Sequence, residues 1–287
     1  MKEYQVLIRK KSASTAALVV AASLVLAGCA GSPGSESKSA AGHEEIAELR
    51  VGMDISYPPF DFFDKGEPAG IDVDVANALG EELGVPVKIE NIGFDSLISS
   101  LQGGRVDVII SAMKDSKERH QRLNLIDYFK TGESLLVKRG NPKGITDIAS
   151  LCGLKVGQVS GTVTLIAMEE ASKKCQDKPI EVLPFGSNAD VNVALKSDRI
   201  DANLEDNASL QYTAKTSSDG MDFEVIPQES RGEHYFGIAT LKSDTAKTEV
   251  VRKAYRQVLE SGKLAQIYNK WGYPDAVPNG LIENVGD

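Results

Sequence analysis

The feature that most constrains the fold is an alternation of strand-like and helix-like segments that runs twice along the chain. Short runs rich in β-branched residues predict strands, and longer amphipathic segments predict helices. Strands are predicted over residues 49–54, 85–90 and 106–110, with helices over 71–83 and 95–102 between them. The pattern then restarts, with strands over 155–159, 180–183 and 202–204 and helices over 162–172 and 188–197. Such β-α-β alternation implies parallel strands covered by helices, in one sheet per lobe.

An internal echo supports two similar lobes. The segment Leu101–Asp107 reads LQGGRVD, and Leu195–Asp201 reads LKSDRID, each running from a helix end into a strand at the same place in the pattern. The 259 residues after position 28 exceed what one core usually holds, so two lobes of roughly 100–130 residues are expected. Residues 244–261 form a long amphipathic pattern, followed by a shorter one ending at Trp271, and we expect both helices to pack back onto the first lobe.

The amino-terminal region has the pattern of an export signal. Positive charges precede an apolar run over residues 13–26 that is too short to span a bilayer comfortably. The run closes with Leu26-Ala27-Gly28-Cys29, which resembles the bacterial lipobox. We therefore predict a lipoprotein signal peptide over residues 1–28 and a membrane lipid anchor on Cys29, the alternative being an ordinary secretory signal that ends near a cysteine. The Gly/Ser/Pro-rich stretch over 29–47 predicts a flexible tether.

Charge and cysteine content narrow the partners. Residues 1–28 carry four Lys/Arg and one Glu, so the remainder has 28 basic and 40 acidic residues and a net charge of −12, which argues against a nucleic-acid partner. With Cys29 assigned to lipid, Cys152 and Cys175 remain in a compartment where disulfides persist, and we predict that they pair. By closing the loop between the two cysteines, the bridge would stabilise the folded state by roughly 3 kcal/mol. The alternative is two separate buried thiols.

Signatures of enzymes and metal sites are scarce. The sequence has no nucleophile elbow, no Walker loop and no His-Glu-x-x-His motif, and its three histidines, His43, His120 and His234, are scattered. We expect no metal, no cofactor and no catalytic residue. The glycine-rich turn at Gly157–Thr162 has free amides that suit an anionic group, although such turns often have no ligand.

Four segments together resemble the polar-amino-acid-binding proteins of ABC importers, which have the type II periplasmic-binding-protein fold. They are VGMDISYPPFDF from Val51, GIDVDV from Gly70, ISAMKDSKER from Ile110, and VSGT from Val159 together with LED from Leu204. The resemblance runs from about Leu49 to Trp271. It implies an α/β, two-lobed fold with a mixed sheet in each lobe and a ligand cleft between the lobes. Lobe 1 would comprise residues 48–137 and 234–287 and lobe 2 residues 138–233, linked by crossing strands near 135–139 and 233–236.

The resemblance also implies roles for particular residues. A free amino acid carries a carboxylate and an ammonium group, which Arg119 and Asp206 would bind. Tyr57 and Phe94 match the aromatic walls around the ligand side chain. Ser111 and Ala112 would contribute a hydroxyl and backbone groups around the carboxylate, Thr162 further donors, and Asp54 and Glu205 would face the side chain.

Lys114 departs from the family pattern, which usually has Thr or Ser at this position. A second cation near Arg119 needs compensation, from an acidic ligand, from Asp115 or from Glu118. The acidic residues Asp54, Glu205, Asp206 and Glu233 favour a cationic amino acid, whereas Lys114 favours an acidic one, so the sequence leaves the ligand open.

The implied function is capture of a free polar or charged amino acid by lobe closure and delivery to a membrane permease with a separate ATPase subunit. The protein would be a monomer, extracytoplasmic and anchored by lipid, on the outer face of a Gram-positive cell or on the periplasmic side otherwise. Two other interpretations of the function are possible from the sequence. The first is an enzyme on the same scaffold, similar to cyclohexadienyl dehydratases, with Glu205 or Glu233 as its acid. The second is a sensory ligand-binding module, which the lack of an apolar segment after Trp271 disfavours.

Overall fold

The computed structural model describes residues 47–228 and 231–286. The predicted signal peptide, the lipid attachment at Cys29 and almost all of the predicted tether lie outside these residues and stay predictions. Among the described residues, the first strand begins at Leu49, as the sequence pattern predicts.

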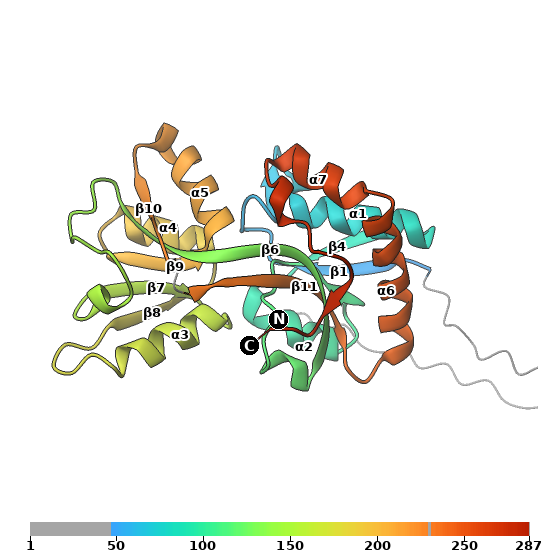
Figure 1. Ribbon diagram of the computed structural model, residues 1–287, viewed down its shortest axis with the longest axis horizontal. Helices are drawn as coiled ribbons and strands as arrows, with labels where there is room; N and C mark the ends of the chain where they lie inside the picture. The colour runs from blue at the N-terminus through green and yellow to red at the C-terminus, as the bar shows by residue number, and fades with distance from the viewer. Residues whose placement is uncertain (1–46, 229–230, 287) are drawn as a thin grey trace, which may run out of the picture. The chain divides into compact units, whose positions relative to one another are not determined.

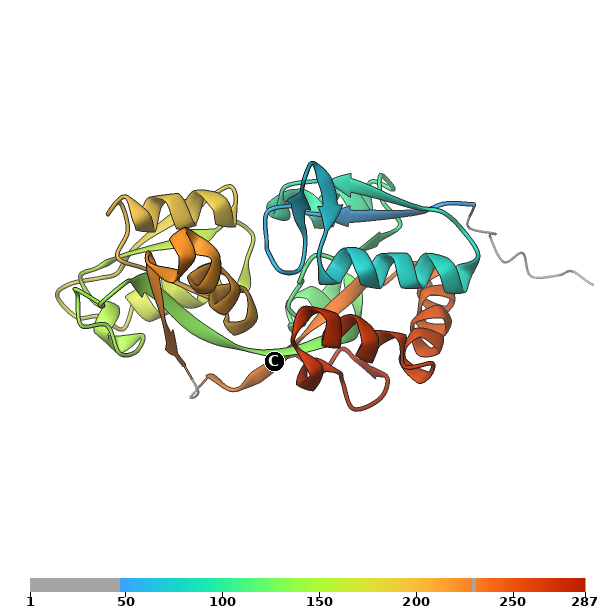
Figure 2. The same cartoon turned by 90° about the horizontal axis from the view of Figure 1, so that it is seen from above.

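Two groups of strands, each covered by helices, are joined by two long strands (Figures 1 and 2). The sheet order is β4-β1-β5-β11-β6-β9-β7-β8, with β10 and β12 also pairing with β6 and with β2 and β3 forming a separate hairpin. The strands are β1 (Leu49–Met53), β2 (Phe62–Asp64), β3 (Glu67–Ala69), β4 (Val87–Asn91), β5 (Val108–Ile109), β6 (Leu123–Lys138), β7 (Lys155–Val159), β8 (Glu181–Phe185), β9 (Ala202–Asp206), β10 (Phe223–Pro227), β11 (Glu233–Leu241) and β12 (Ile282–Glu283).

Pairing within this order is mixed. β1 is parallel to β4 and β5, and β7 is parallel to β8 and β9, as the two β-α-β patterns predict. β11 and β6 are antiparallel to their neighbours, which gives each lobe the mixed sheet implied by the family resemblance.

The α-helices lie within a few residues of the predicted ones, except for the helix over 207–216, which no pattern predicted. They are α1 (Ile71–Leu83), α2 (Leu97–Gln102), α3 (Val163–Ser172), α4 (Asn188–Lys196), α5 (Asn207–Thr216), α6 (Thr245–Glu260) and α7 (Lys263–Trp271); the short 3-10 helices are η1 (Phe94–Ser96), η2 (Arg119–Gln121), η3 (Ala149–Leu151), η4 (Ser217–Gly220) and η6 (Pro274–Ala276). The two carboxy-terminal helices share one core with α1, in which Val251, Tyr255 and Tyr268 are fully buried. This confirms that they pack back onto the first lobe.

β6 and β11 carry the chain between the lobes. β6 pairs with β11 as far as Gly132 and with β9 from Glu133 onward. The first crossing was predicted over 135–139, so the change of partner lies somewhat earlier in the chain. The second crossing, predicted over 233–236, lies at the start of β11. We use lobe 1 and lobe 2 for the two parts, and their exact limits stay a proposal.

The internal echo corresponds to a repeated contact. In lobe 1, the Asp107 carboxylate accepts the Arg50 N–H at 3.1 Å, and the Asp107 N–H donates to the Arg50 carbonyl at 2.8 Å. In lobe 2, Asp201 and Lys155 make the same reciprocal pair, at 2.9 and 2.7 Å. Each aspartate thus ties the end of a crossover to the start of the lobe's first strand.

The predicted disulfide is confirmed. Cys152 and Cys175 are bonded, with their Cα atoms 5.6 Å apart and a sequence separation of 23. Cys152 follows η3 and Cys175 follows α3, so the bridge joins two segments at the edge of lobe 2.

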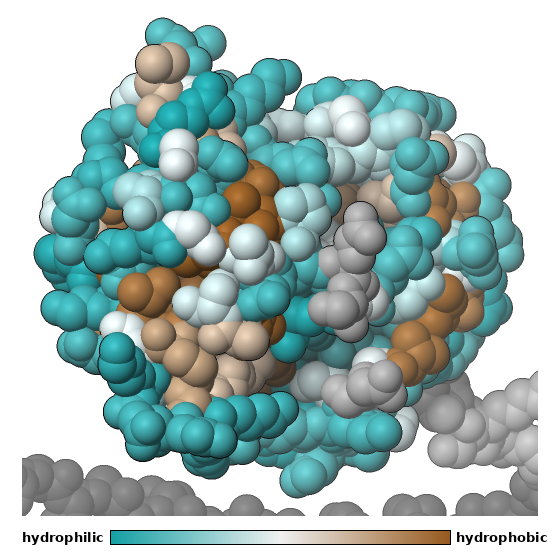
Figure 3. Space-filling view, turned by 60° about the vertical axis from the view of Figure 1, so that its left-hand side comes forward, coloured by the Kyte–Doolittle hydropathy of each residue, from teal (hydrophilic) through white to brown (hydrophobic). Residues whose placement is uncertain are grey.

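The surface is mostly hydrophilic on the face shown in Figure 3, with small apolar areas. Among the described residues, the large apolar side chains that are exposed come from five separate segments: Phe63, Ile166, Val193, Met221 and Val285. No helix among the described residues has the length and apolar character needed to cross a membrane.

Candidate functional site

A pocket lies where the carboxyl ends of the parallel strands of both lobes meet. Open α/β sheets place their ligands at this end of the strands. The cavity has a volume of about 40 Å³ and is lined from lobe 1 by residues that follow β1, β4 and β5, and from lobe 2 by residues that end or follow β7, β8 and β9. The lining residues are Asp54, Ser56, Tyr57, Phe94, Ser111, Ala112, Lys114, Arg119, Val159, Thr162, Val163, Thr164, Asn188, Glu205 and Asp206. All nine residues predicted to contact ligand, Glu205 included, are therefore brought together, although their contact with a ligand stays a prediction.

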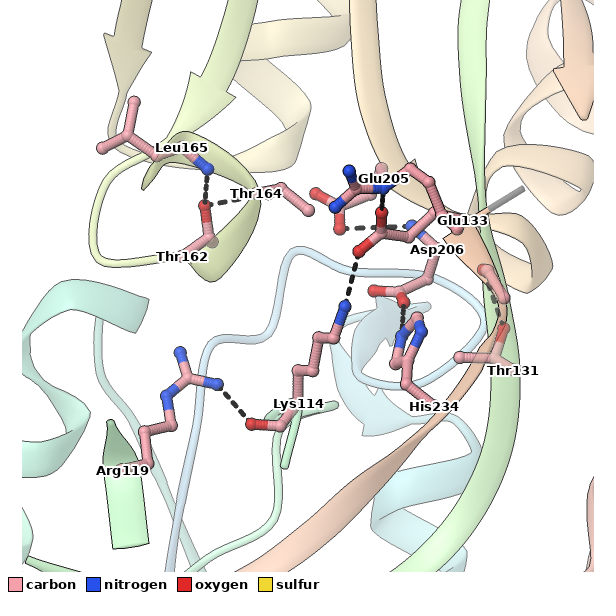
Figure 4. Close-up of polar contacts among 12 residues, drawn as sticks. Lys114, Arg119, Thr131, Glu133, Thr162, Thr164, Leu165, Glu205, Asp206 and His234 are labelled. Atoms are coloured by element: carbon pink, nitrogen blue, oxygen red, sulfur yellow. Dashed lines mark hydrogen bonds and ion pairs between the residues drawn. The ribbon is translucent and has the colours of Figure 1, made fainter. Parts of the chain in front are cut away.

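Arg119 is a buried cation without a carboxylate partner among the described residues. Its side chain is 5% exposed, and its guanidinium donates to the carbonyls of Lys114 at 2.7 Å and Gly161 at 3.3 Å (Figure 4). The guanidinium also lies 5.6 Å from the centre of the Phe94 ring. Burial lowers the pKa of Arg119 to about 10, so it stays charged near neutral pH. A buried guanidinium held by carbonyls has N–H groups left for an anionic ligand group.

Asp206 lies opposite, at the end of β9 in lobe 2. One carboxylate oxygen accepts the Tyr57 hydroxyl at 2.9 Å, and the other lies 2.6 Å from the His234 ring nitrogen. Tyr57 comes from lobe 1 and His234 from the start of β11, so Asp206 joins both lobes and a crossing strand. The histidine contact was missed by sequence reasoning, because only the pairing of β11 with β6 brings His234 to Asp206.

Glu205 places a second carboxyl group beside Asp206. It is 4% exposed and lines the pocket. Burial, and then the neighbouring Asp206 carboxylate, raise the pKa of Glu205 well above its usual range. No Lys or Arg of the described chain forms an ion pair with Glu205, so this part of the pocket can take up a cation.

Asp54, Ser111 and Ala112 form the lobe 1 floor of the pocket. The Asp54 carboxylate accepts the Ser56 hydroxyl at 2.8 Å and the Phe94 N–H at 3.0 Å, while burial raises the pKa of Asp54. The Ser111 hydroxyl donates to buried Asp61 at 2.7 Å.

Like the Ser111 hydroxyl, the Ala112 N–H already has a partner, because it donates to Asp72 at 2.7 Å. The resemblance implied that Ser111 and Ala112 supply donors to a ligand carboxylate. In this structure both donors already bond to buried aspartates, Asp61 and Asp72, so the two residues shape the pocket floor.

Thr162 begins helix α3 on the lobe 2 side. Its hydroxyl accepts the Leu165 N–H at 3.2 Å and caps the helix, as the strand-to-helix turn predicts (Figure 4). The first N–H groups of a helix have no partner within the helix, and Val163 and Thr164, which open α3, line the pocket, so this end of the helix favours an anion.

Gly161, just before Thr162, allows close approach of the lobes. Its φ is +78°, and a Cβ there would lie 2.9 Å from the Cα of Asp95 in lobe 1. A side chain at this position would therefore hinder closure.

Lys114 forms an ion pair that sequence reasoning did not anticipate. Its ammonium group lies 2.6 Å from Glu133 on β6, and Glu133 also binds Arg231 (Figure 4). Burial opposes ionisation of Glu133, but Arg231 and Lys114 outweigh it and lower its pKa. Compensation was expected from Asp115, Glu118 or the ligand, and this expectation is corrected, because Glu133 lies at the point where β6 enters lobe 2. Lys114 therefore gives no reason to expect an acidic ligand.

Glu233, the other acid considered, does not line the pocket. Its side chain is 70% exposed and pairs with Lys130 at 3.2 Å. Within residues 47–228 and 231–286, no group of three or more His, Cys, Asp or Glu side chains could hold a metal ion.

Two α/β lobes joined by two crossing strands, with a charged cleft between them, define the class of two-lobed solute-binding proteins. Residues 49–274 match the family model described as bacterial extracellular solute-binding proteins, family 3, and the chain belongs to this family.

The relatives are similar along most of their length. The L-arginine-binding protein of Pseudomonas aeruginosa is 30% identical over 233 residues, which cover 78% of this chain and 87% of the relative. A solved structure of an ancestral arginine-binding protein bound to arginine has a TM-score of 0.74 and 31% identity, covering 79% of this chain and 99% of that one. A structure of an ancestral amino-acid-binding protein, described as a precursor of cyclohexadienyl dehydratase, has a TM-score of 0.70 and 30% identity, covering 78% and 95%.

Proposed function

We propose that this solute-binding protein captures a free cationic amino acid in the cleft and delivers it to the permease of an ABC importer. The observation that carries the proposal is the distribution of charge in the pocket. Arg119 has no carboxylate partner among residues 47–228 and 231–286, and it is accompanied in the pocket by three acidic side chains, Asp54, Glu205 and Asp206.

The charges in the pocket indicate which residues bind the carboxylate, the ammonium group and the side chain of the ligand. Its carboxylate binds Arg119 and the amino end of α3, which carry the unpaired donors. Its ammonium group binds Asp206. Lys114 is already paired with Glu133, so Asp54 and Glu205 are left with a net requirement for a cation, which the side chain of the ligand supplies. The arginine-binding relatives support this assignment.

Ligand capture proceeds by closure of the lobes. Several contacts already cross between them, including Tyr57 to Asp206 at 2.9 Å, Ser209 to the Pro58 carbonyl at 2.9 Å and Arg119 to the Gly161 carbonyl. A ligand that touches Arg119 on one side and Asp206 on the other favours this closed form, because only closure completes its contacts.

Isothermal titration calorimetry on the purified chain lacking residues 1–28 tests the proposal. Arginine, lysine and ornithine are expected to bind with one site per chain, whereas glutamate and aspartate are expected to give no heat. Glutamine serves as the uncharged control of similar length. Tight binding of glutamate with no binding of arginine would overturn the charge assignment, and no binding of any amino acid would overturn the function.

We propose further that the protein is a monomer held to the outer face of a membrane by lipid on Cys29. The lipobox at Leu26–Cys29 supports the anchor. Radioactive palmitate fed to expressing bacteria should label the wild-type chain and leave a Cys29→Ser variant unlabelled. Equal labelling of both variants would refute the anchor.

A second candidate is an enzyme of the cyclohexadienyl dehydratase type. Glu205 favours it, because a buried carboxyl group with a raised pKa is suited to act as a general acid. Incubation with arogenate or prephenate distinguishes the two functions. Turnover that is lost in Glu205→Gln would support the enzyme, and unchanged substrate would support transport alone.

A further inference from the structure

The carboxy-terminal segment after η6 extends past the residues that match the family model, which end at position 274. Its strand β12 pairs antiparallel with β6, with Ile282 opposite Asp127 and Glu283 opposite Ile126. Ion pairs from Arg252 on α6 hold Glu283 in place. The segment therefore lies along the long strand that crosses between the lobes.

Asn284 fixes the end of β12. Its side chain accepts the Leu125 N–H at 2.9 Å, and its own N–H donates to the Leu125 carbonyl at 3.1 Å. Its φ is +51°, a left-handed conformation that asparagine tolerates better than most residues. This turn directs the chain away from β6 and toward the loop that follows β5.

The last described residues bind one buried carboxylate. The N–H groups of Val285 and Gly286 donate to the same oxygen of Asp115, at 2.7 and 2.8 Å, and Asp115 is 1% exposed. Gly286 packs against the loop so closely that a Cβ would lie 2.2 Å from the Asp115 carbonyl oxygen. Only glycine fits at this position.

Asp115 belongs to the loop that carries both pocket cations. It directly follows Lys114, whose carbonyl accepts the Arg119 guanidinium at 2.7 Å. The Asp115 N–H donates to the Tyr235 carbonyl of β11 at 2.9 Å, and its other carboxylate oxygen contacts His120, the residue after Arg119. The position of Asp115 therefore affects the position of Lys114 and Arg119.

A buried carboxylate needs donors, and few are available here. Asp127, which is fully buried on β6, faces Asp115, and within the described residues no N–H group donates to either of its oxygens. Removing two N–H donors from Asp115 would leave His120 and the protonated Asp127, whose pKa burial and Asp115 raise, as the side-chain groups that face this carboxylate. The loop would then shift to expose Asp115 to water, because unpaired buried charge is costly.

We propose that the segment from Leu281 to Gly286 is a latch that positions Arg119 and Lys114 for ligand binding by anchoring Asp115. Asp115 is a positioning residue in this arrangement, since it lines no part of the pocket. The latch adds to the proposed function and relies on it only for the ligand used as a readout.

Substitution at Gly286 tests the latch. In Gly286→Ala the added methyl group collides with the Asp115 backbone and lifts the end of the segment away, while every pocket residue is kept. Val285→Ala is the matched control, because the Val285 side chain is 51% exposed and its N–H donor is retained. We expect the affinity for arginine to fall about tenfold in Gly286→Ala and to stay unchanged in Val285→Ala.

A readout that needs no ligand accompanies the titration. Amide hydrogen exchange of residues 114–120 should become faster in Gly286→Ala than in Val285→Ala, while exchange in β7 and β9 of lobe 2 stays the same. A second control, Lys247→Ala, removes the ion pair with Asp107 elsewhere in lobe 1 and should lower stability without changing affinity. Unchanged exchange of 114–120 in Gly286→Ala would overturn the latch, whether or not any ligand binds. Faster exchange with unchanged affinity would overturn the positioning role.

Discussion

Arg119 is the residue whose surroundings are explained least by stability alone. It is a buried cation whose partners are two carbonyl groups and an aromatic ring. Such a cation costs free energy to bury without a carboxylate, and a ligand carboxylate offsets that cost. We expect Arg119→Ala to lower the affinity for arginine at least about a hundredfold, with the melting temperature nearly unchanged. Arg119→Lys keeps the charge and loses the planar fork, so its affinity should be intermediate.

Calorimetry on the two variants measures this effect, with circular dichroism as the control for folding. Wild-type affinity in Arg119→Ala would show that the ligand carboxylate binds elsewhere, with the amino end of α3 as the remaining set of donors.

Glu205 gives a prediction about pH. Burial and Asp206 raise its pKa, so it holds a proton over a range where an ordinary glutamate does not. A cationic ligand favours the ionised form and releases this proton on binding, so affinity should rise as pH increases above the ordinary titration range of a glutamate, near about pH 4. In Glu205→Gln the slope should become smaller, because the carboxyl group that releases the proton is gone. Titrations at several pH values measure both slopes, and equal slopes in the two proteins would contradict the proton release.

The pocket residues that lie in family motifs could be predicted from the sequence, whereas their contacts with residues outside the motifs could not, because these depend on tertiary structure. Arg119 and Asp206 stand in recognisable segments at strand ends, so their meeting could be predicted. Glu133 and His234 lie within long strands, where the sequence shows no motif, and only the register of β6 against β9 and β11 brings them to the site.

At the level of elements, the disulfide between the ends of η3 and α3 is expected to brace lobe 2 without taking part in binding. The loop it closes spans 23 positions, so removing it should lower the free energy of unfolding by about 3 kcal/mol. A double variant, Cys152→Ala with Cys175→Ala, compared with wild type by urea denaturation, tests this. Affinity for arginine should not change, since neither cysteine lines the pocket. A large loss of affinity in a double variant that is still fully folded would show that the bridge also orients α3.

The elements that sequence patterns predicted well are those with a local signal. Helices α1, α4 and α6 have clear amphipathic periodicity, and β1 and β7 are short runs between turn residues. β6 was predicted only at its end, because its sixteen residues pass through two different environments and show no single alternation. β10 and β12 are strands because they pair with β6, and no local sequence pattern predicts this pairing.

At the scale of the molecule, opposing groups of carboxylates set the dependence of stability on pH. Burial raises the pKa of Asp107, but hydrogen bonds from Arg50 and Lys247 outweigh it and lower the value to about 2. Such a group stabilises the fold above its unfolded pKa and loses this contribution as pH falls toward 2. Buried Asp72 and Asp127 act in the other direction, with pKa values of about 7 and about 8.

The second group gives the last prediction. Burial, and then the neighbouring Asp115, raise the pKa of Asp127, so the unfolded chain releases this proton near pH 4 while the folded chain keeps it until about pH 8. The stability of the folded state should therefore be greatest near about pH 4 to 5 and fall by a few kcal/mol toward about pH 8. In Asp127→Asn this fall in stability should be smaller. In Asp107→Asn the fall toward about pH 8 should remain, and the loss of stability at acid pH that Asp107 causes should disappear. Urea denaturation across this pH range measures both variants. A wild type whose stability rises toward about pH 8 would mean that Asp127 is already ionised in the fold, with a donor reaching it that the closed arrangement around Asp115 does not provide.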